Sequence, residues 1–156
     1  MLNLEDSKTL ISAYRFIEKN CDLIDEFVYR HSINFGPSPE YYSTFDVTNN
    51  IIDLIERKNR LINLKLMIDE LINTLSIEDR KIILAKMRYN LSMRIISQMF
   101  QISSLRTAFR RMNKALQNFT MHANNSRYKE RLERVIDDEY WISNIRKSIQ
   151  EINICG

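Results

Sequence analysis

The sequence predicts an all-α protein, and three observations support this prediction. Glycine and proline are scarce, with two of each in 156 residues, whereas strand-rich folds need frequent turn residues. Long stretches carry apolar residues at intervals of three and four, which is the spacing of one helix face. Apolar residues form 44% of the chain, enough for a packed core. We expect an N-terminal helical hairpin, three short helices and a C-terminal packing helix.

Residues 4–34 are expected to form one long amphipathic helix. Asp6 or Ser7 can cap its start. The stretch GPSP at 36–39 then breaks the helix, because proline disfavours helical geometry at the residue before it. The apolar positions that recur at helical spacing are Leu10, Tyr14, Ile17, Cys21, Ile24, Val28 and His31.

Residues 47–75 carry a heptad pattern typical of a coiled-coil helix. Lys58 and Lys65 occupy core-type positions in this pattern, where a lysine lowers stability and can fix the register. The stripe fits a hairpin with residues 4–34 and fits equally well the seam of a homodimer. Its apolar members are Ile51, Leu54, Ile55, Leu61, Ile62, Leu64, Ile68, Leu71, Ile72 and Leu75.

Three short helices are expected next, over 77–89, 92–100 and 103–118, with the lengths and turns of a helix-turn-helix unit. The carboxylate of Asp79 can reach back to complete a capping box, and Asn90 can end the first helix in a left-handed conformation. The predicted N-terminal caps are Ser76, Ser92 and either Ser103 or Ser104.

The last part of the chain is expected to contain a loop, TMHANNS, after Phe119 and then a single packing helix over 127–153. Its apolar side is predicted from Leu132, Ile136, Tyr140, Ile145, Ile149 and Ile152. We therefore predict three domains: a hairpin for oligomerisation or partner binding over 1–75, a helix-turn-helix over 76–119, and a helical tail over 120–156.

Positive charge is concentrated in one segment. Residues 78–118 hold nine Lys or Arg and two acids, whereas residues 1–77 hold eight and twelve, and residues 119–156 hold six of each. No acid occurs between Asp79 and Glu130. Like charges on one helix face repel each other, and a polyanion would relieve that repulsion. The segment therefore favours nucleic-acid binding.

The same segment resembles region 4 of sigma-70-type transcription factors. The resemblance covers 75–119, LSIEDRKIILAKMRYNLSMRIISQMFQISSLRTAFRRMNKALQNF. It lies in the helix ending in RY, in the serine-capped helix with its IS at 102–103, and in the Arg-rich helix closing on KAL. The chain is also similar to phage-encoded regulators of the ArpU type. It departs from the family at Gln101, where glycine is usual, and by one additional residue before KAL.

The resemblance implies a double-stranded DNA-binding transcription regulator or sigma-like factor, with helix 103–118 in the major groove. RNA polymerase is a further candidate partner. The residues expected to read bases are Arg106, Thr107, Arg110 and Arg111. Those expected to hold phosphates are Ser92, Arg94, Ser103, Ser104 and Lys114. The expected core of this domain is Ile82, Ile83, Ile95, Ile96, Met99, Leu105, Phe109, Met112 and Leu116.

The sequence offers no pattern for an enzyme, a cofactor or a metal site. It has no Gly-rich phosphate loop, no nucleophile elbow and no metal-ligand spacing, so we expect no catalytic residues. Cys21 and Cys155 lie far apart, and no leader or membrane span is evident, so a cytoplasmic location is expected. Two alternative functions stay open: an adaptor that binds RNA polymerase or another protein, and a phage small-terminase-like DNA-packaging protein.

Overall fold

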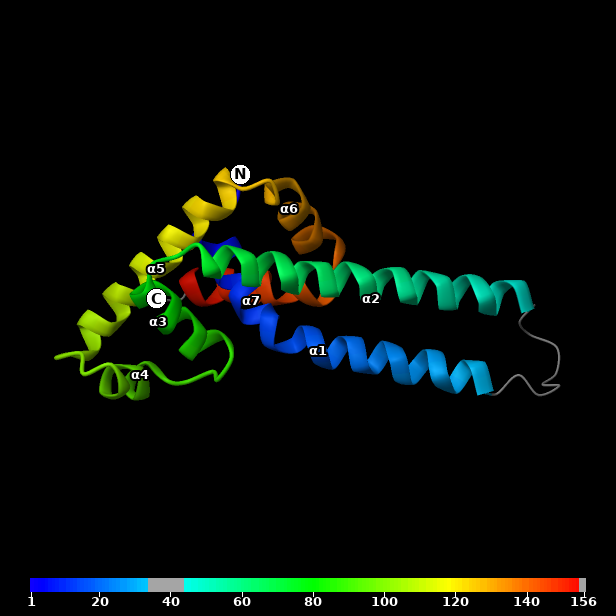
Figure 1. Cartoon of the computed structure of the whole chain (residues 1–156), viewed down its shortest axis with the longest axis horizontal. Helices are drawn as coiled ribbons and strands as arrows, with labels where there is room; N and C mark the ends of the chain where they lie inside the picture. Colours follow the sequence, from blue (N-terminus) through cyan, green and yellow to red (C-terminus); the bar gives the residue numbers. More distant parts are fainter. Residues whose placement is uncertain (34–43, 155–156) are drawn as a thin grey trace. The chain divides into compact units, whose positions relative to one another are not determined.

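Seven helices and no strand occur in the computed structural model, which describes residues 1–33 and 44–154 (Figure 1). The predicted all-α class is therefore confirmed. The GPSP stretch and Cys155 lie outside the described residues. The helices are α1 (Leu4–Ile33), α2 (Thr44–Asn73), α3 (Ile77–Met87), α4 (Met93–Met99), α5 (Leu105–Asn125), α6 (Lys129–Asp138) and α7 (Tyr140–Ile154).

The chain divides into two packing units. The hairpin unit is Phe16–Lys65, and the core unit is Met1–Arg15 together with Leu66–Gly156. Each of the two long helices therefore contributes one part to each unit. These units differ from the three segments 1–75, 76–119 and 120–156, whose division into domains remains a prediction.

Within the hairpin unit, α1 and α2 pair in opposite directions. The ammonium of Lys58 lies 2.6 Å from both carboxylate oxygens of Asp25, and Lys65 forms an ion pair with Glu18. Lys65 comes seven residues after Lys58 on α2, whereas its partner Glu18 comes seven residues before Asp25 on α1. The two helices are therefore antiparallel. Each lysine flanks a seam packed from Ile17, Cys21, Ile24, Leu61 and Leu64.

The two lysines at core-type positions thus gain a charged partner at the hairpin seam. Their side chains are about one-quarter exposed, at 28% each. The hydrogen bond that the Lys58 ammonium donates to the Asp25 carboxylate holds the pKa of Lys58 above its ordinary value. A one-heptad slip of the hairpin would place one lysine opposite the other acid and leave the second lysine without its acid, so the present register is the one that pairs both lysines. A homodimer through 47–75 remains a prediction.

In the core unit, the first turn of α1 is held by a capping box different from the predicted cap. The side chain of Asn3 accepts from the Asp6 amide at 2.9 Å, and the Asp6 carboxylate accepts from the Asn3 amide at 2.9 Å. The prediction of Asp6 or Ser7 as the N-cap is therefore wrong. The Ser7 hydroxyl instead lies 2.7 Å from the Thr120 hydroxyl of α5.

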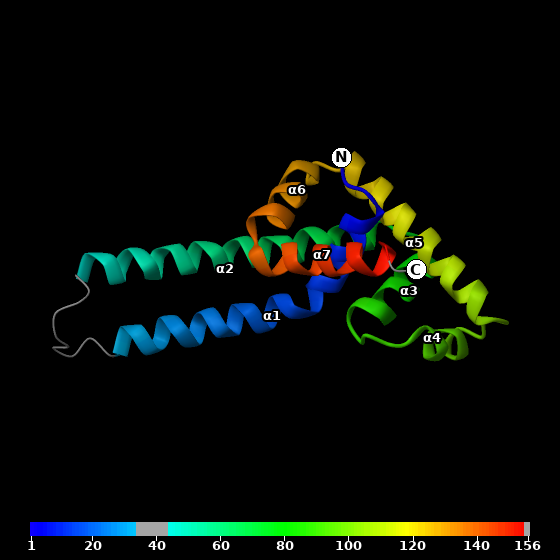
Figure 2. The same cartoon turned by 180° about the vertical axis from the view of Figure 1, so that it is seen from behind.

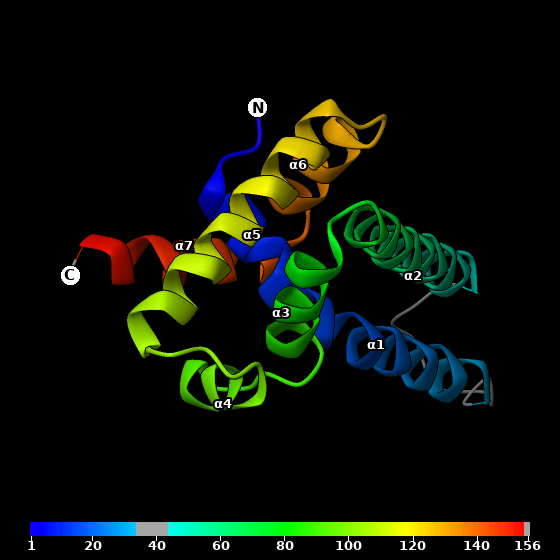
Figure 3. The same cartoon turned by 60° about the vertical axis from the view of Figure 1, so that its left-hand side comes forward.

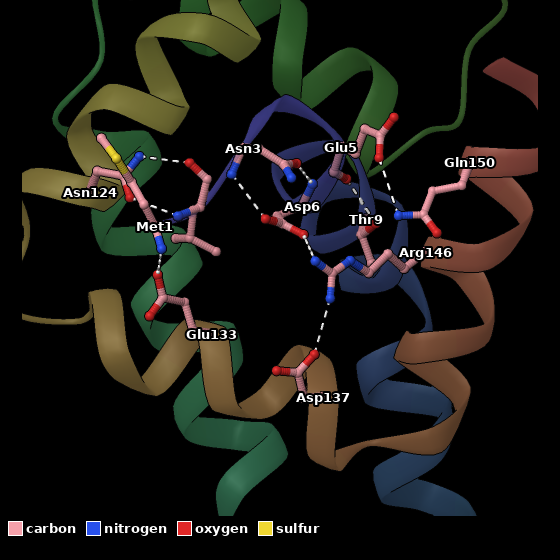
Figure 4. A network of polar contacts seen from close by, with 11 residues as sticks. Met1, Asn3, Glu5, Asp6, Thr9, Asn124, Glu133, Asp137, Arg146 and Gln150 are labelled. Atoms are coloured by element: carbon pink, nitrogen blue, oxygen red, sulfur yellow. Dashed lines mark hydrogen bonds and ion pairs between the residues drawn. The ribbon is translucent and has the colours of Figure 1, made fainter. Parts of the chain in front are cut away.

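Arg146 of α7 joins this turn to the C-terminal helices (Figure 4). Its guanidinium lies 3.0 Å from the buried Asp6 carboxylate and 3.0 Å from Asp137 of α6. Asn124 of α5 bonds both the amide and the carbonyl of Leu2, at 2.9 and 2.8 Å. The start of α1 is therefore tied by polar contacts to α5, α6 and α7.

Helix α5 is the central element of the core unit and contacts α3, α4 and α6 (Figures 2 and 3). Figure 3 shows α4 beside the beginning of α5 and α3 beside its middle. The largest fully buried side chains of the unit are Leu10, Ile68, Ile72, Ile83, Met87, Ile96, Phe119, Leu132 and Ile136.

The C-terminal part differs from the prediction in two places. The predicted loop after Phe119 is wrong, because α5 continues to Asn125 with Phe119 and Ala123 buried on its packed face. The predicted single helix over 127–153 is two helices, since Glu139 takes an extended conformation between α6 and α7. Tyr140 and Ile152, predicted on the packed side, are 75% and 72% exposed. In the described part of the chain, no helix is both long and apolar enough to cross a membrane.

Candidate nucleic-acid interface

Serine caps begin all three helices of the basic segment. Ser76 accepts from the Asp79 amide at 3.2 Å, Ser92 from the Ile95 amide at 3.3 Å, and Ser104 from the Thr107 amide at 3.1 Å. Ser104 rather than Ser103 is therefore the cap of α5. The carboxylate of Asp79 does not complete a capping box; it accepts from the Asn118 amide group of α5 at 2.7 Å.

The turns between these helices use two residues with positive φ. Asn90 has φ 48°, which confirms the left-handed end predicted for α3. Gln101 has φ 51° and ends α4 in a Schellman motif, in which the Gln101 amide bonds Gln98 O and the Ile102 amide bonds Ser97 O. Glycine takes this conformation with less strain than glutamine. The departure at Gln101 is therefore a position where glycine would suit the backbone.

The packed face of α5 lies closer to its alanines than predicted. Ile82, Ile83, Ile96, Met112 and Leu116 are buried as expected. The other four predicted core residues are wrong: Ile95, Met99, Leu105 and Phe109 are 47%, 58%, 47% and 49% exposed. Ala108, Ala115 and Ala123 are buried instead. Small side chains let neighbouring helices approach closely, so the contact face turns toward them and leaves the larger residues at its edge.

Three of the nine cations in 78–118 are used inside the core unit. The Arg80 guanidinium donates to Asn73 O at 2.6 Å, and the Lys86 ammonium donates to Leu91 O at 3.2 Å. Arg88 lies 3.8 Å from the Asp69 carboxylate, which also accepts from the Tyr14 hydroxyl at 2.7 Å.

The electrostatics around Arg88 follow from these contacts. Its hydrogen bond with Tyr14 holds the pKa of Arg88 above the ordinary value. Burial, followed by the bond to Asp69, raises the pKa of Tyr14. Arg88 is thus engaged with Tyr14 and Asp69 within the core unit, although half of its side chain is exposed.

The remaining six cations of the segment are exposed, and in residues 1–33 and 44–154 none of them has a hydrogen bond or ion pair. They come from all three helices, and neither α4 nor α5 contains an acid. The nine cations of the segment thus fall into two groups: three that contact other groups of the core unit and six that are exposed to solvent. The six are Lys81, Arg94, Arg106, Arg110, Arg111 and Lys114.

Four of these six cations line one hollow of about 730 Å³ between the start of α3 and the outer face of α5. Arg110, Arg111 and Lys114 enter it from α5, and Lys81 enters it from α3. Glu78 and Asp79 lie on the α3 side of the hollow. The Asp79–Asn118 bond brings the two helices together here. The sequence leaves open whether Lys81 belongs to the basic surface or only to a solvated helix face. Since the Asp79–Asn118 contact joins residues 39 positions apart, no local pattern places Lys81 beside α5.

The other predicted site residues lie outside that hollow. Arg106 is exposed in the first turn of α5, and Arg94 is exposed on α4. Thr107 is half-buried, and its hydroxyl accepts from the Ser104 hydroxyl at 2.9 Å. Ser92 and Ser104 act as caps, whereas Ser103 is exposed beside the cap. The predicted residues therefore form one cluster of three, with the others along α4 and the start of α5.

No group of three or more His, Cys, Asp or Glu side chains that could hold a metal ion occurs in the described ranges. Comparisons of the chain with protein-family models, with curated proteins and with solved structures find no match. The function therefore has to be argued from the geometry and charge of the chain itself.

Proposed function

We propose that this protein is a sequence-specific double-stranded DNA-binding transcription regulator or sigma-like factor, and that α5 enters the major groove. The observation that carries the proposal is the set of six exposed cations on α3, α4 and α5 that have no hydrogen-bond or ion-pair partner among residues 1–33 and 44–154. A fold has no need to leave like charges together on one surface, and phosphates would neutralise them. The resemblance of 75–119 to sigma region 4 supports the same function.

The start of α5 is shaped for such an insertion. Its exposed residues include Leu105, Arg106, Phe109 and Arg110, so one face of the first two turns is open to a partner while Ala108 on the other face is buried. An α-helix is about 10–12 Å across, and the major groove is about 12 Å wide. Arg106 and Arg110 are then the best candidates for base edges, with Thr107 as a shorter contact.

The hollow supports a second role for the more distant cations. Lys81 and Lys114 carry compact charges on flexible stems, which suits contact with phosphates rather than with particular bases. Arg111 shares the hollow with them. We therefore expect Lys81, Arg111 and Lys114 to hold one DNA strand while the start of α5 reads the groove.

The test is a titration of double-stranded DNA at several salt concentrations, using a site selected from a random pool. Binding by the wild type should weaken steeply with salt, because each phosphate contact adds about −0.9 to the slope of log K against log salt. Arg110→Ala with Arg111→Ala should lower affinity by about 10- to 100-fold and reduce discrimination between sites. Absence of DNA binding by the wild type would refute the proposal.

A matched control is available on α6. Arg131 and Arg134 are exposed, so Arg131→Ala with Arg134→Ala removes the same charge from another surface. This variant should bind DNA about as well as the wild type does. An equal loss in both double variants would mean that net charge, rather than a defined interface, accounts for the binding.

A second candidate function, a protein-interaction adaptor, is favoured by the exposed apolar side chains of α4 and α5. Ile95, Met99, Leu105 and Phe109 are each about half exposed, and exposed apolar residues often mark protein contacts. RNA polymerase is the candidate partner. Pull-down of purified polymerase by a wild type that does not bind DNA, lost with Met99→Ser and Phe109→Ser, would support this function over direct DNA reading.

A further inference from the structure

The hairpin unit has a second apolar stripe on α2 that α1 does not cover. Phe45, Ile52, Ile55 and Ile62 are 73%, 47%, 45% and 40% exposed, and Asn59 is exposed among them. Residues 52, 55, 59 and 62 follow the alternating three-and-four spacing of coiled-coil core positions. This set, called the outer stripe, differs from the seam that packs against α1.

The outer stripe is rotated away from the seam by about 100°, the turn of an α-helix per residue. Ile52, Ile55 and Ile62 each come one position after a more buried residue, namely Ile51, Leu54 and Leu61. On α1, by contrast, the exposed Leu23 and Phe27 come one position before their inward-facing neighbours Ile24 and Val28. Because the helices are antiparallel, that α1 set lies on the opposite face of the hairpin.

Asn59 indicates which partner suits the outer stripe. Its amide carries both donors and an acceptor, so two copies of the same side chain can bond each other across a two-fold axis. An apolar partner of another kind would leave this amide unpaired within the contact, which costs free energy. A single asparagine at such a position is also the residue type that sets register and oligomeric state in parallel coiled coils.

The spacing of the outer stripe favours a parallel arrangement. In a parallel pair in register at Asn59, each isoleucine of the stripe lies level with the same isoleucine of the second copy. In an antiparallel pair centred on Asn59, Ile55 would lie level with Asn63 and Ile62 level with Glu56 of the second copy, so polar groups would enter the apolar layers.

We propose that a second copy of this chain covers the outer stripe, with the two α2 helices parallel and in register at Asn59. Ile52, Ile55 and Ile62 then form the apolar layers on either side of the asparagine pair. The seam predicted from Leu54 and Leu61 stays within each chain, and self-association uses the neighbouring face. This assembly does not depend on the DNA-binding function.

Sedimentation of the full chain at increasing concentration tests the proposal. The wild type should reach twice its mass of 18.7 kDa. Ile55→Lys with Ile62→Lys should weaken self-association by at least about 100-fold, because charges would enter an apolar contact. Circular dichroism should show unchanged helix content, since both positions are already about half exposed.

Leu23→Lys with Phe27→Lys is the matched control, because it adds the same charge at exposed apolar positions of the same unit. This variant should associate like the wild type. A wild type that stays monomeric at all concentrations would overturn the proposal. So would a dimer that survives Ile55→Lys with Ile62→Lys, or one that the control variant dissociates equally.

The parallel orientation has its own test by disulfide formation. Ile52→Cys, in a chain whose Cys21 and Cys155 are changed to alanine, should form a covalent dimer on oxidation. Parallel pairing sets the two new cysteines side by side, whereas an antiparallel pair centred on Asn59 separates them by about 21 Å, beyond disulfide reach. A dimer that forms without this cross-link would overturn the parallel arrangement.

Discussion

Two polar regions of the core unit differ in whether their charged side chains are paired. Around the first turn of α1, the buried Asp6 carboxylate meets Arg146 and the Asn3 amide, and Arg146 also meets Asp137 (Figure 4). On the outer faces of α3, α4 and α5, six cations meet no partner in the described part of the chain. The first region contains both signs of charge, and the second contains almost only positive charge.

The difference separates residues that hold the fold from residues that the fold leaves for a partner. A buried charge without a partner is costly, so the groups around Asp6 have to be paired for the chain to fold. Exposed like charges repel each other slightly, so the fold gains nothing from them. Substitutions should therefore lower stability in the first region and lower binding in the second.

The largest effect on stability is expected at Arg146. Arg146→Ala leaves the Asp6 carboxylate, 4% exposed, without its cationic partner. We expect the free energy of unfolding to fall by about 2–4 kcal/mol, since breaking a buried pair strands the other charge. Urea denaturation measures this change. Lys147 is exposed beside it, and Lys147→Ala should change stability by less than about 0.5 kcal/mol. Equal effects of the two variants would mean that the Arg146–Asp6 pair does not stabilise the fold.

The cap of α5 should give the next largest effect. Ser104→Ala removes the acceptor for the Thr107 amide and should lower the free energy of unfolding by about 1 kcal/mol. Ser103→Ala is the control, because Ser103 is exposed and does not cap the helix, and it should have little effect. Thermal unfolding of both variants distinguishes the two serines; a larger loss at Ser103 would mean that α5 begins one residue earlier.

Gln101→Gly should change stability in the other direction. Gln101 holds φ at 51°, which glycine adopts without the steric strain of a Cβ atom. We expect a gain of about 0.5–1 kcal/mol, reduced by the greater freedom of glycine in the unfolded chain. Gln98→Gly, in the last turn of α4, should instead destabilise the protein. A loss of stability in both variants would show that the left-handed turn does not strain Gln101.

Local patterns predicted more of the fold than long-range contacts did. Ser76, Ser92 and the left-handed Asn90 depend on neighbours three or four residues away, and the sequence predicts them correctly. The sequence leaves Ser103 and Ser104 open as caps of α5, and its cap for α1 is wrong. The buried face of α5 depends on the helices that pack against it and contains Ala108 and Ala115, so the prediction from the large residues Leu105 and Phe109 is wrong. The role of Arg146 depends on Asp6, 140 positions earlier, and no spacing indicates it.

The candidate site shows the same contrast between local patterns and long-range contacts. The exposure of Arg106, Arg110, Arg111 and Lys114 follows from one helix face, and the structure agrees with the prediction that they point away from the core. The sequence does not indicate which of the nine cations have partners within the fold. Arg80, Lys86 and Arg88 bind carbonyl and carboxylate groups that belong to other turns and helices. Sequence therefore gives the direction of a side chain more readily than its partner.

The smallest effect on stability is the one that tests the comparison most directly. Arg110→Ala with Arg111→Ala removes two exposed charges that lack partners within the described residues. We expect the free energy of unfolding to stay within about 0.5 kcal/mol of the wild type, or to rise slightly as repulsion with Lys114 is relieved. The same variant should lose DNA affinity. A marked loss of stability would instead make these arginines part of the fold, and the distinction between the two regions would fail.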